Sequence, residues 1–429
     1  MAKLKFYGGT EEVGNVRITL EHNGQTVCLD YGSKQDHEDD DKAFPRSDYV
    51  VVSHAHLDHV GNLPFSLKLN PGTRYVGTEM TKKITEYQLN DILKIAERRK
   101  REGVPGNTPA GRQFTLDDIL AIKTGWVSAD YNDTTKVGDF DVKLVNAGHI
   151  PGSAITEVTC GTDRIVYTGD VNLEGDLQKE LPGLGSLQKD PKALIIESTY
   201  GKEARDPIDK QEQTFIRYVE EAMSKGKNVF VPAFAIERMQ RVGSLLSRIR
   251  DDHPDYEFYM VSPSYLKMKD MAYRDIDLSN LTESAGLPND YRGRKSVIVS
   301  TSGFCTGGIS SKILREVIEN KNYTIIVPSG FLPGNSPLKS AVDTGYAEFS
   351  DKGGAKVKKR LRAELKQVKL SAHSDKGGLV KIVETVCPDK TTQIYLVHGE
   401  PSSQAALTQE LAARGYQVKI PKKYEEFCL

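Results

Sequence analysis

The 429-residue chain lacks long apolar runs. No stretch approaches the roughly 20 apolar residues that a helix needs to span a membrane. The segment 1–6 lacks the apolar core of a signal peptide. We therefore expect no membrane partner and a cytoplasmic location. The composition, 38% hydrophobic and 27% charged, is instead typical of a globular protein, and the length suits two large domains.

Cysteine is scarce. The five cysteines are widely spaced and form no C-x-x-C pair: Cys28, Cys160, Cys305, Cys387 and Cys428. An odd number at this spacing argues against a disulfide framework and against a zinc site built from thiolates. We therefore expect reduced and mostly buried cysteines.

The chain also lacks an excess of charge of either sign. Its net charge is −1, so bulk charge gives no support for nucleic-acid binding. The charges are unevenly placed, however: residues 36–41 hold five acids, and residues 352–369 hold eight basic residues against the single acid Glu364. By itself such a basic run is most often a solvated face.

The pattern of predicted elements changes near residue 200. The earlier part contains short strands with tight turns, such as the hairpin signal Asn23-Gly24. Helices and strands then alternate, which predicts βαβ units and a parallel sheet. We expect a first domain at 1–204, an inserted domain at 205–360, and a return to the first domain at 361–429.

The strongest motif is a cluster of metal-binding side chains at 53–59, directly after a short apolar strand. Three imidazoles and one carboxylate in so short a segment suit zinc. Four donors on one loop do not wrap a single tetrahedral ion comfortably. We therefore expect His54 and His56 to bind one ion, and Asp58 and His59 a second. A lone histidine is usually an ordinary polar residue, but a cluster of this density predicts a metal site.

Further donors follow other strand runs. His149 and Asp170 lie in turn sequences after predicted strands, and a carboxylate at 170 is placed to bridge two ions. His373 and His398 also come directly after strand runs. Each of these turn sequences is a weak signal alone, but together they supply enough ligands for two ions.

These residues resemble the metallo-β-lactamase superfamily and, within it, the β-CASP nucleases, over essentially the whole chain. The superfamily's metal motifs are matched by Asp30, the 54–59 segment, His149 and Asp170. The three β-CASP motifs are matched by segments 197–201, 371–375 and 397–400, and segments 232–240 and 302–308 of the inserted domain also resemble the family. In length the chain looks like the short prokaryotic relatives of the cleavage and polyadenylation specificity factor endonuclease.

The resemblance implies an α/β fold, with an αββα metallo-β-lactamase sandwich from 1–204 and 361–429 and an inserted parallel α/β β-CASP domain at 205–360. It implies two zinc ions per chain, with Mn²⁺ as an alternative. The implied ligands are His54, His56 and His149 on the first ion, Asp58, His59 and His398 on the second, and Asp170 between the two.

The implied activity is hydrolysis of RNA by a hydroxide that both metals activate, leaving 5′-phosphate and 3′-hydroxyl ends. His373, hydrogen-bonded to Glu197, is expected to donate a proton to the leaving oxygen. Asp30 is expected to orient a ligand or its loop. A histidine at 398 is typical of the RNA-processing branch, whereas the DNA-repair branch usually has valine there. We therefore expect a single-stranded RNA substrate.

Substrate contacts are expected from the inserted domain and the basic run. Lys358 and Arg360 are candidates for phosphate contacts. A glycine-rich turn before a predicted helix offers backbone N–H groups to a phosphate, and its candidate residues are Ser302, Gly303, Thr306 and Gly307. Arg238 is the last candidate, with an ion pair to a carboxylate as the alternative for its side chain.

Three other functions stay open. A DNA nuclease of the same superfamily is disfavoured only by His398. A small-molecule metallo-hydrolase of the lactonase or thioesterase type shares the 54–59 cluster but needs neither the inserted domain nor His373. A non-catalytic RNA-binding subunit tolerates loss of metal. The choice between endonuclease and 5′-exonuclease action, and whether the chain forms a homodimer, are likewise open.

Overall fold

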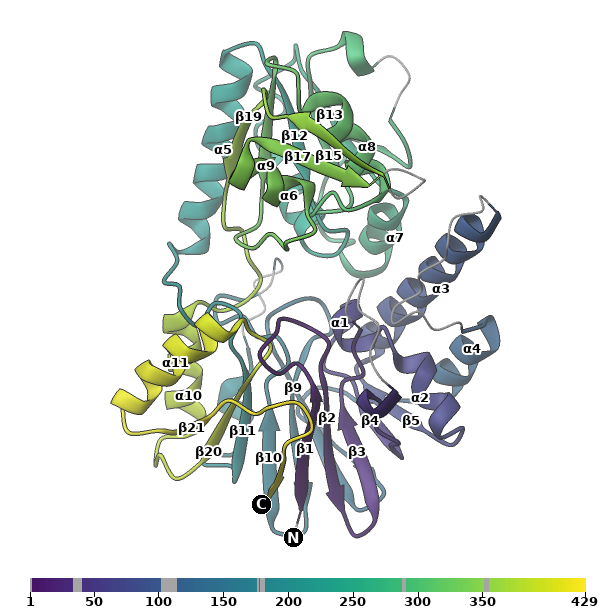
Figure 1. The fold of residues 1–429 in the computed structure, drawn as a ribbon, viewed down its shortest axis with the longest axis vertical. Coiled ribbons are helices and arrows are strands. Elements are labelled where there is room, and N and C mark those ends of the chain that lie inside the picture. The colour runs from purple at the N-terminus through teal and green to yellow at the C-terminus, as the bar shows by residue number, and fades with distance from the viewer. Residues whose placement is uncertain are drawn as a thin grey trace. The chain divides into compact units, whose positions relative to one another are not determined.

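The structure is a computed structural model that describes residues 2–33, 41–101, 114–175, 177, 182–287, 291–350 and 355–429. The acidic run at 36–41 and Lys352 lie outside the residues whose side chains are described. The chain divides into two compact units (Figure 1). The first contains Met1–Ala204 and Ala372–Leu429, and the second contains Arg205–Ser371.

Two seven-stranded sheets form the centre of the first unit. One sheet has the order β22 (Glu426–Cys428), β1 (Lys3–Gly8), β2 (Arg17–His22), β3 (Gln25–Leu29), β4 (Tyr49–Val51), β5 (Arg74–Gly77) and β6 (Trp126–Ser128). The other has the order β21 (Gln417–Lys419), β20 (Gln393–Val397), β11 (Ala193–Glu197), β10 (Asp163–Tyr167), β9 (Ala154–Cys160), β8 (Phe140–Asn146) and β7 (Thr134–Val137). Alternating apolar residues such as Leu4, Ile18 and Val158 face inward and join both sheets in one core.

Helices cover the outer faces of this sandwich. On the first sheet they are α1 (Leu57–Val60), α2 (Leu63–Leu69), α3 (Glu79–Arg101) and α4 (Leu116–Thr124). On the second they are α10 (Lys376–Val386) and α11 (Pro401–Ala413). Helix α4 begins at a capping box, in which Thr115 and Asp118 exchange hydrogen bonds. The layers are αββα, as the resemblance implies.

The second unit is a parallel α/β domain. Its six-stranded sheet has the order β14 (Thr282–Ser284), β13 (Glu257–Val261), β15 (Ser296–Ser300), β12 (Asn228–Pro232), β16 (Tyr323–Val327) and β19 (Glu364–Gln367), and every neighbouring pair is parallel. The helices are α5 (Ile208–Ser224), α6 (Arg238–Ser247), α7 (Pro263–Ala272), α8 (Gly308–Val317) and α9 (Pro337–Thr344). A separate antiparallel hairpin joins β17 (Tyr346–Ser350) to β18 (Lys356–Arg360). The fold class predicted from the sequence is therefore confirmed.

The second unit is longer than the sequence pattern suggested. The chain was expected to return to the first domain at residue 361. Instead, β19 pairs with β16 as an edge strand of the parallel sheet, and Val368 and Leu370 are buried in that unit's core. The boundary therefore falls after Ser371.

The composition drew attention to two features, the burial of the cysteines and the apolar content of the helices. Cys28, Cys160, Cys305 and Cys387 are buried free thiols, whereas Cys428 is exposed. Within the described parts of the chain, no helix combines the length and the apolar content needed to cross a bilayer.

Candidate metal centre

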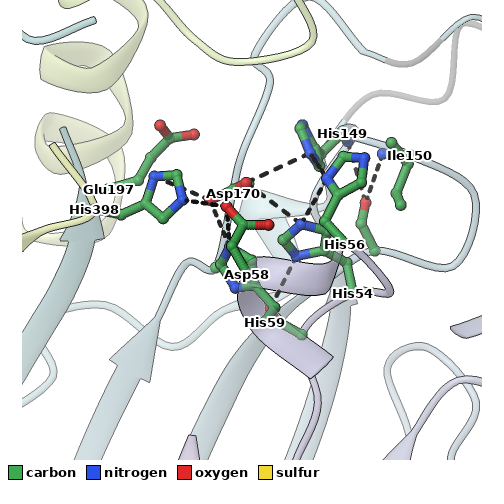
Figure 2. A network of polar contacts seen from close by, with 12 residues as sticks. His54, His56, Asp58, His59, His149, Ile150, Asp170, Glu197 and His398 are labelled. Atoms are coloured by element: carbon green, nitrogen blue, oxygen red, sulfur yellow. Dashed lines mark hydrogen bonds and ion pairs between the residues drawn. The ribbon is translucent and has the colours of Figure 1, made fainter. Parts of the chain in front are cut away.

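The predicted ligands all lie in the first unit, at ends of strands and in the loops that follow them. His54 and His56 are in the loop between β4 and α1, and Asp58 and His59 are in the first turn of α1. The others follow one strand each: His149 follows β8, Asp170 follows β10 and His398 follows β20. Because these strands end at one edge of the sandwich, side chains far apart in sequence point toward one another (Figure 2).

Three imidazoles and one carboxylate form the first group: His54, His56, His149 and Asp170. Nδ1 of His56 lies 3.1 Å from Nε2 of His54 and 3.1 Å from Nε2 of His149. Two nitrogens bound to one tetrahedral zinc at its usual bond length lie about 3.4 Å apart. This group therefore has the donor types and the spacing of a zinc site.

Asp58, His59 and His398 form the second group. Nε2 of His398 lies 3.3 Å from Oδ2 of Asp58. Asp170 faces both groups, since its Oδ2 lies 3.4 Å from Nε2 of His54 and its Oδ1 lies 3.4 Å from Nε2 of His59. Figure 2 shows this carboxylate between the two sets of imidazoles.

Two buried atoms that lack a hydrogen-bond partner in the described part of the chain support a cation at this position. Nε2 of His59 and Oδ1 of Asp170 are buried, and neither makes a hydrogen bond within the described residues. A buried polar atom without a partner costs roughly 1–3 kcal/mol. A divalent cation bound here would remove that cost, so the residues present fit a metal.

The protonation of the first group also suits a metal. Burial, together with a neighbouring imidazole, lowers the pKa of His54 and of His149, and it lowers the pKa of His56 to about 3. These imidazoles are therefore neutral at neutral pH, which is the form that binds a metal.

The second group is dominated by its carboxylates. Burial alone would lower the pKa of His398, but Asp170 and Asp58 raise it to about 9. Burial alone would raise the pKa of Asp58 and of Asp170, but the surrounding imidazoles lower both. The ionised carboxylates are thus compensated by cationic imidazoles here, and a metal ion is the alternative source of that positive charge.

Asp30 orients His59 of the second group. Its Oδ2 lies 2.6 Å from Nδ1 of His59 and accepts a hydrogen bond from the Tyr167 hydroxyl at 2.7 Å. The backbone N–H and the hydroxyl of Ser53 donate to the same carboxylate, each at 2.7 Å. The carboxylate thereby fixes the His59 ring with Nε2 turned toward Asp170.

Two other ligands are oriented in the same way. Nδ1 of His149 lies 2.6 Å from the carbonyl oxygen of Ala372, and Nδ1 of His398 lies 2.9 Å from Oγ1 of Thr199. The roles of Ser53, Tyr167 and Thr199 were not predicted from the sequence. Two of them could have been found from their position in the sequence. Ser53 directly precedes His54, and Thr199 lies in the 197–201 motif.

The His373 imidazole and Glu197 form a pair next to the ligands. Nδ1 of His373 lies 3.0 Å from both carboxylate oxygens of Glu197, and its Nε2 lies 3.8 Å from Oδ2 of Asp170. Burial alone would lower the pKa of His373, but Glu197 and Asp170 raise it. Glu197 is fully buried and accepts the backbone N–H of Val171, whereas His373 remains 19% exposed. The pair thus combines an imidazole whose protonated form is favoured with access from solvent.

The predicted substrate residues all belong to the second unit. Ser302, Gly303, Thr306 and Gly307 share the turn between β15 and α8. Arg238 is buried and donates to the Glu237 carboxylate at 2.9 Å and to the carbonyl of Pro328. Lys358 is exposed but paired with Glu348 at 2.7 Å, and Arg360 is exposed on the same strand. Arg238 therefore has the carboxylate partner that was the alternative to RNA.

Two family models and several known proteins match this chain. The model of the metallo-beta-lactamase superfamily matches residues 45–196, and the model of the Zn-dependent metallo-hydrolase RNA specificity domain matches residues 358–421. The chain is 31% identical over 447 residues to "RNase aCSPSF2" from Saccharolobus solfataricus, covering 99% of this chain and 85% of the relative. It is 27% identical to "Probable RNase MJ4" from Methanocaldococcus jannaschii, with 99% of each covered. It is 26% identical to Integrator complex subunit 11 from Danio rerio, covering 95% of this chain and 71% of the relative.

A solved structure, that of a protein of unknown function from Enterococcus faecalis, has a similar fold, with a TM-score of 0.57 and 14% identity over the whole of both chains. The αββα sandwich and its cluster of donors at the strand ends define a metallo-hydrolase of the metallo-β-lactamase class. Within that class, the relation to the archaeal RNase shows that the chain belongs to the β-CASP family of metallo-β-lactamase ribonucleases.

Proposed function

We propose that this protein is a zinc-dependent ribonuclease that hydrolyses phosphodiester bonds of single-stranded RNA and leaves 5′-phosphate and 3′-hydroxyl ends. The observation that carries the proposal is the shared carboxylate of Asp170, which faces two donor groups while the His373–Glu197 pair lies next to it. The RNA specificity match at 358–421 and the relatives named as ribonucleases support RNA over other esters.

The candidate ligands form two groups, one for each ion. His54, His56 and His149 would hold one zinc, Asp58, His59 and His398 the other, and Asp170 both. Two bound metals supply Lewis acidity and lower the pKa of water toward neutrality. Asp30, Thr199 and the carbonyl of Ala372 hold three of the rings in their binding orientation.

His373 would supply the proton. Glu197 holds the imidazole by Nδ1 and raises its pKa, which favours the protonated form that carries a proton on Nε2. A general acid at this position protonates the leaving 3′ oxygen, a step that typically contributes about 10²- to 10⁴-fold in rate. The 19% exposure of His373 leaves the ring within reach of a substrate.

The test compares RNA and DNA of one sequence. Both strands carry a 5′ label and are incubated with the zinc-loaded protein, with His56→Ala, and with His253→Ala as a histidine control in the second unit. We expect cleavage of RNA only, 5′-phosphate on the new ends, loss of activity in His56→Ala and full activity in His253→Ala. The product ladder separates internal cutting from stepwise trimming. Cleavage of DNA with equal efficiency, or hydrolysis of small esters without any RNA cleavage, would overturn the proposal.

A further inference from the structure

The hairpin of β17 and β18 presents a basic face with an aromatic side chain. The strands pair with Tyr346 opposite Arg360 and Glu348 opposite Lys358. Successive side chains alternate between the two sides of a strand, so these four residues and Lys356 project from one side. We call Tyr346, Glu348, Lys356, Lys358 and Arg360 the hairpin face.

The opposite side anchors the hairpin to its unit. Ala347 and Phe349 are buried in the core that surrounds α8 and α9. Arg315 of α8 lies over the Phe349 ring at 4.5 Å and donates to the carbonyl oxygen of Ser350 at 2.6 Å. The backbone N–H of Glu348 donates to the Ser340 hydroxyl of α9. The hairpin face is therefore presented on a packed support.

The charge of the hairpin face is positive. Lys356, Lys358 and Arg360 carry three positive charges against the single carboxylate of Glu348. Both lysines point at that carboxylate, at 3.6 Å and 2.7 Å, and they remain 74% and 63% exposed. Exposed pairs of this kind are worth at most about 1 kcal/mol. Arg360 has no ion-pair partner among the residues that the structure describes. The three cations are thus available to an anionic ligand.

Tyr346 adds an exposed aromatic ring beside these cations, and binding a simple anion does not require such a ring. Its side chain is 43% exposed, one of few large apolar side chains so exposed in the described chain. It lies at one end of the row of cations, directly across the hairpin from Arg360. An exposed ring among cations that follow an extended strand suits single-stranded nucleic acid, in which phosphates and stacking bases alternate.

We propose that the hairpin face is an RNA-binding site in its own right. Lys356, Lys358 and Arg360 bind successive phosphates of a single strand, and a base stacks on Tyr346. The choice of RNA over other polyanions rests on the proposed function. The match to the RNA specificity domain begins at residue 358, within β18.

The test measures binding of a fluorescent 30-nucleotide oligouridylate to the zinc-loaded protein in a His373→Ala background, so that the strand stays intact. We expect Lys356→Glu/Lys358→Glu/Arg360→Glu to weaken binding at least tenfold. The slope of log K against log salt should fall by about 2, since each phosphate contact on a single strand contributes about 0.7. Tyr346→Ala should weaken binding about fivefold or more, and Tyr346→Phe should retain it, because stacking needs the ring and not the hydroxyl.

The matched control reverses the same number of charges elsewhere, with Lys136→Glu/Lys210→Glu/Lys225→Glu at exposed positions. Circular dichroism and bound zinc establish that each variant is folded. Equal affinities of the hairpin variant and the control would overturn the proposal. So would binding of polyglutamate as tight as that of RNA, which would assign the face to an acidic protein.

Because these assays measure binding without cleavage, they remain valid if the wild-type protein fails to cut RNA. Failure of the proposed function and failure of the hairpin proposal are therefore seen in different experiments.

Discussion

Oδ2 of Asp30 lies 2.6 Å from Nδ1 of His59, and both side chains are fully buried. The carboxylate fixes the ring so that Nε2 faces Asp170. Losing such a support typically costs a metal site about 10- to 100-fold in affinity. We therefore expect Asp30→Asn to lower the affinity for one of the two zinc ions by that factor and to leave the affinity for the other nearly unchanged. Competition with a chromophoric chelator measures both affinities.

Asp141→Asn is the matched control, since Asp141 is an aspartate of the same unit that is 46% exposed and lies near the start of β8, whereas His149 follows the end of that strand. The Asp141→Asn protein should bind both zinc ions with the affinities of the wild type. An Asp30→Asn protein that binds two zinc ions with wild-type affinity would show that the hydrogen bond does not tune the site.

The candidate metal ligands could be found from the sequence because donor side chains are densely clustered and lie at regular positions after strands. Four of the seven donors fall within 54–59, and the remaining three each directly follow a strand. Strands that run in the same direction end at the same edge of a sheet, which made these three residues candidate ligands. Their assignment to two ions together with the 54–59 cluster came from the resemblance to the metallo-β-lactamase superfamily. The structure brings all seven together.

The supporting residues were not accessible in the same way. Tyr167 meets Asp30 across 137 positions, a contact that depends on how two sheets pack. The pairing of Arg238 with its neighbour Glu237 depends on an unusual backbone, since Glu237 has a φ of 68°. The last residues of the second unit were misplaced because β19 is a short, polar edge strand, which lacks the apolar run of the central strands.

The pH dependence of cleavage tests the His373–Glu197 pair. Because the carboxylate raises the pKa of His373, the acid form persists to higher pH than in a free imidazole, and activity should fall as pH rises through that raised value. Glu197→Gln removes the charge while keeping the shape. We expect its alkaline limb to shift to lower pH and its rate at the optimum to fall at least tenfold.

The measurement is kcat/KM on a labelled RNA from pH 5 to 10, with bound zinc determined at each pH. His373→Ala should lose the alkaline limb altogether, together with about 10²- to 10⁴-fold in rate. An alkaline limb at the same pH in Glu197→Gln and wild type would assign that limb to another group.

Glu237 makes the second unit sensitive to acid. Burial alone would raise its pKa, but Arg238 and Arg241 lower it to about 2, from 4.5 for a free carboxyl. The stabilisation is fully present above pH 4.5 and is lost as the pH falls toward 2. We expect the melting temperature of the second unit to fall over that window in wild type. Glu237→Gln should lack this contribution and be destabilised by about 3–5 kcal/mol at pH 7, because two buried guanidinium groups lose the carboxylate that they share.

Glu257→Gln provides the comparison, since that carboxylate is 40% exposed. The stability of Glu257→Gln should stay within about 0.5 kcal/mol of wild type.

The pairing of Arg238 with Glu237 predicts that loss of RNA binding in an Arg238 variant goes together with loss of stability. A stable Arg238→Met protein with weakened RNA binding would restore the arginine as a direct contact.

Metal removal should act on one unit only. All seven donors belong to the first unit, and without a cation Nε2 of His59 and Oδ1 of Asp170 have no hydrogen-bond partner within the described residues. A metal that binds only the folded state stabilises it by RT ln(1 + [L]/Kd), which is about 4 kcal/mol at a thousandfold excess over Kd. We therefore expect chelation to lower the melting temperature of the first unit and to leave that of the second unchanged.

Calorimetry with and without chelator separates the two transitions, and readdition of zinc should restore the first. His56→Ala weakens one donor group, so its first transition should respond less to chelation, whereas His253→Ala should behave as wild type. Equal shifts of both transitions would mean that the two units unfold as one cooperative body, and the absence of any shift would mean that the cluster holds no metal in the purified protein.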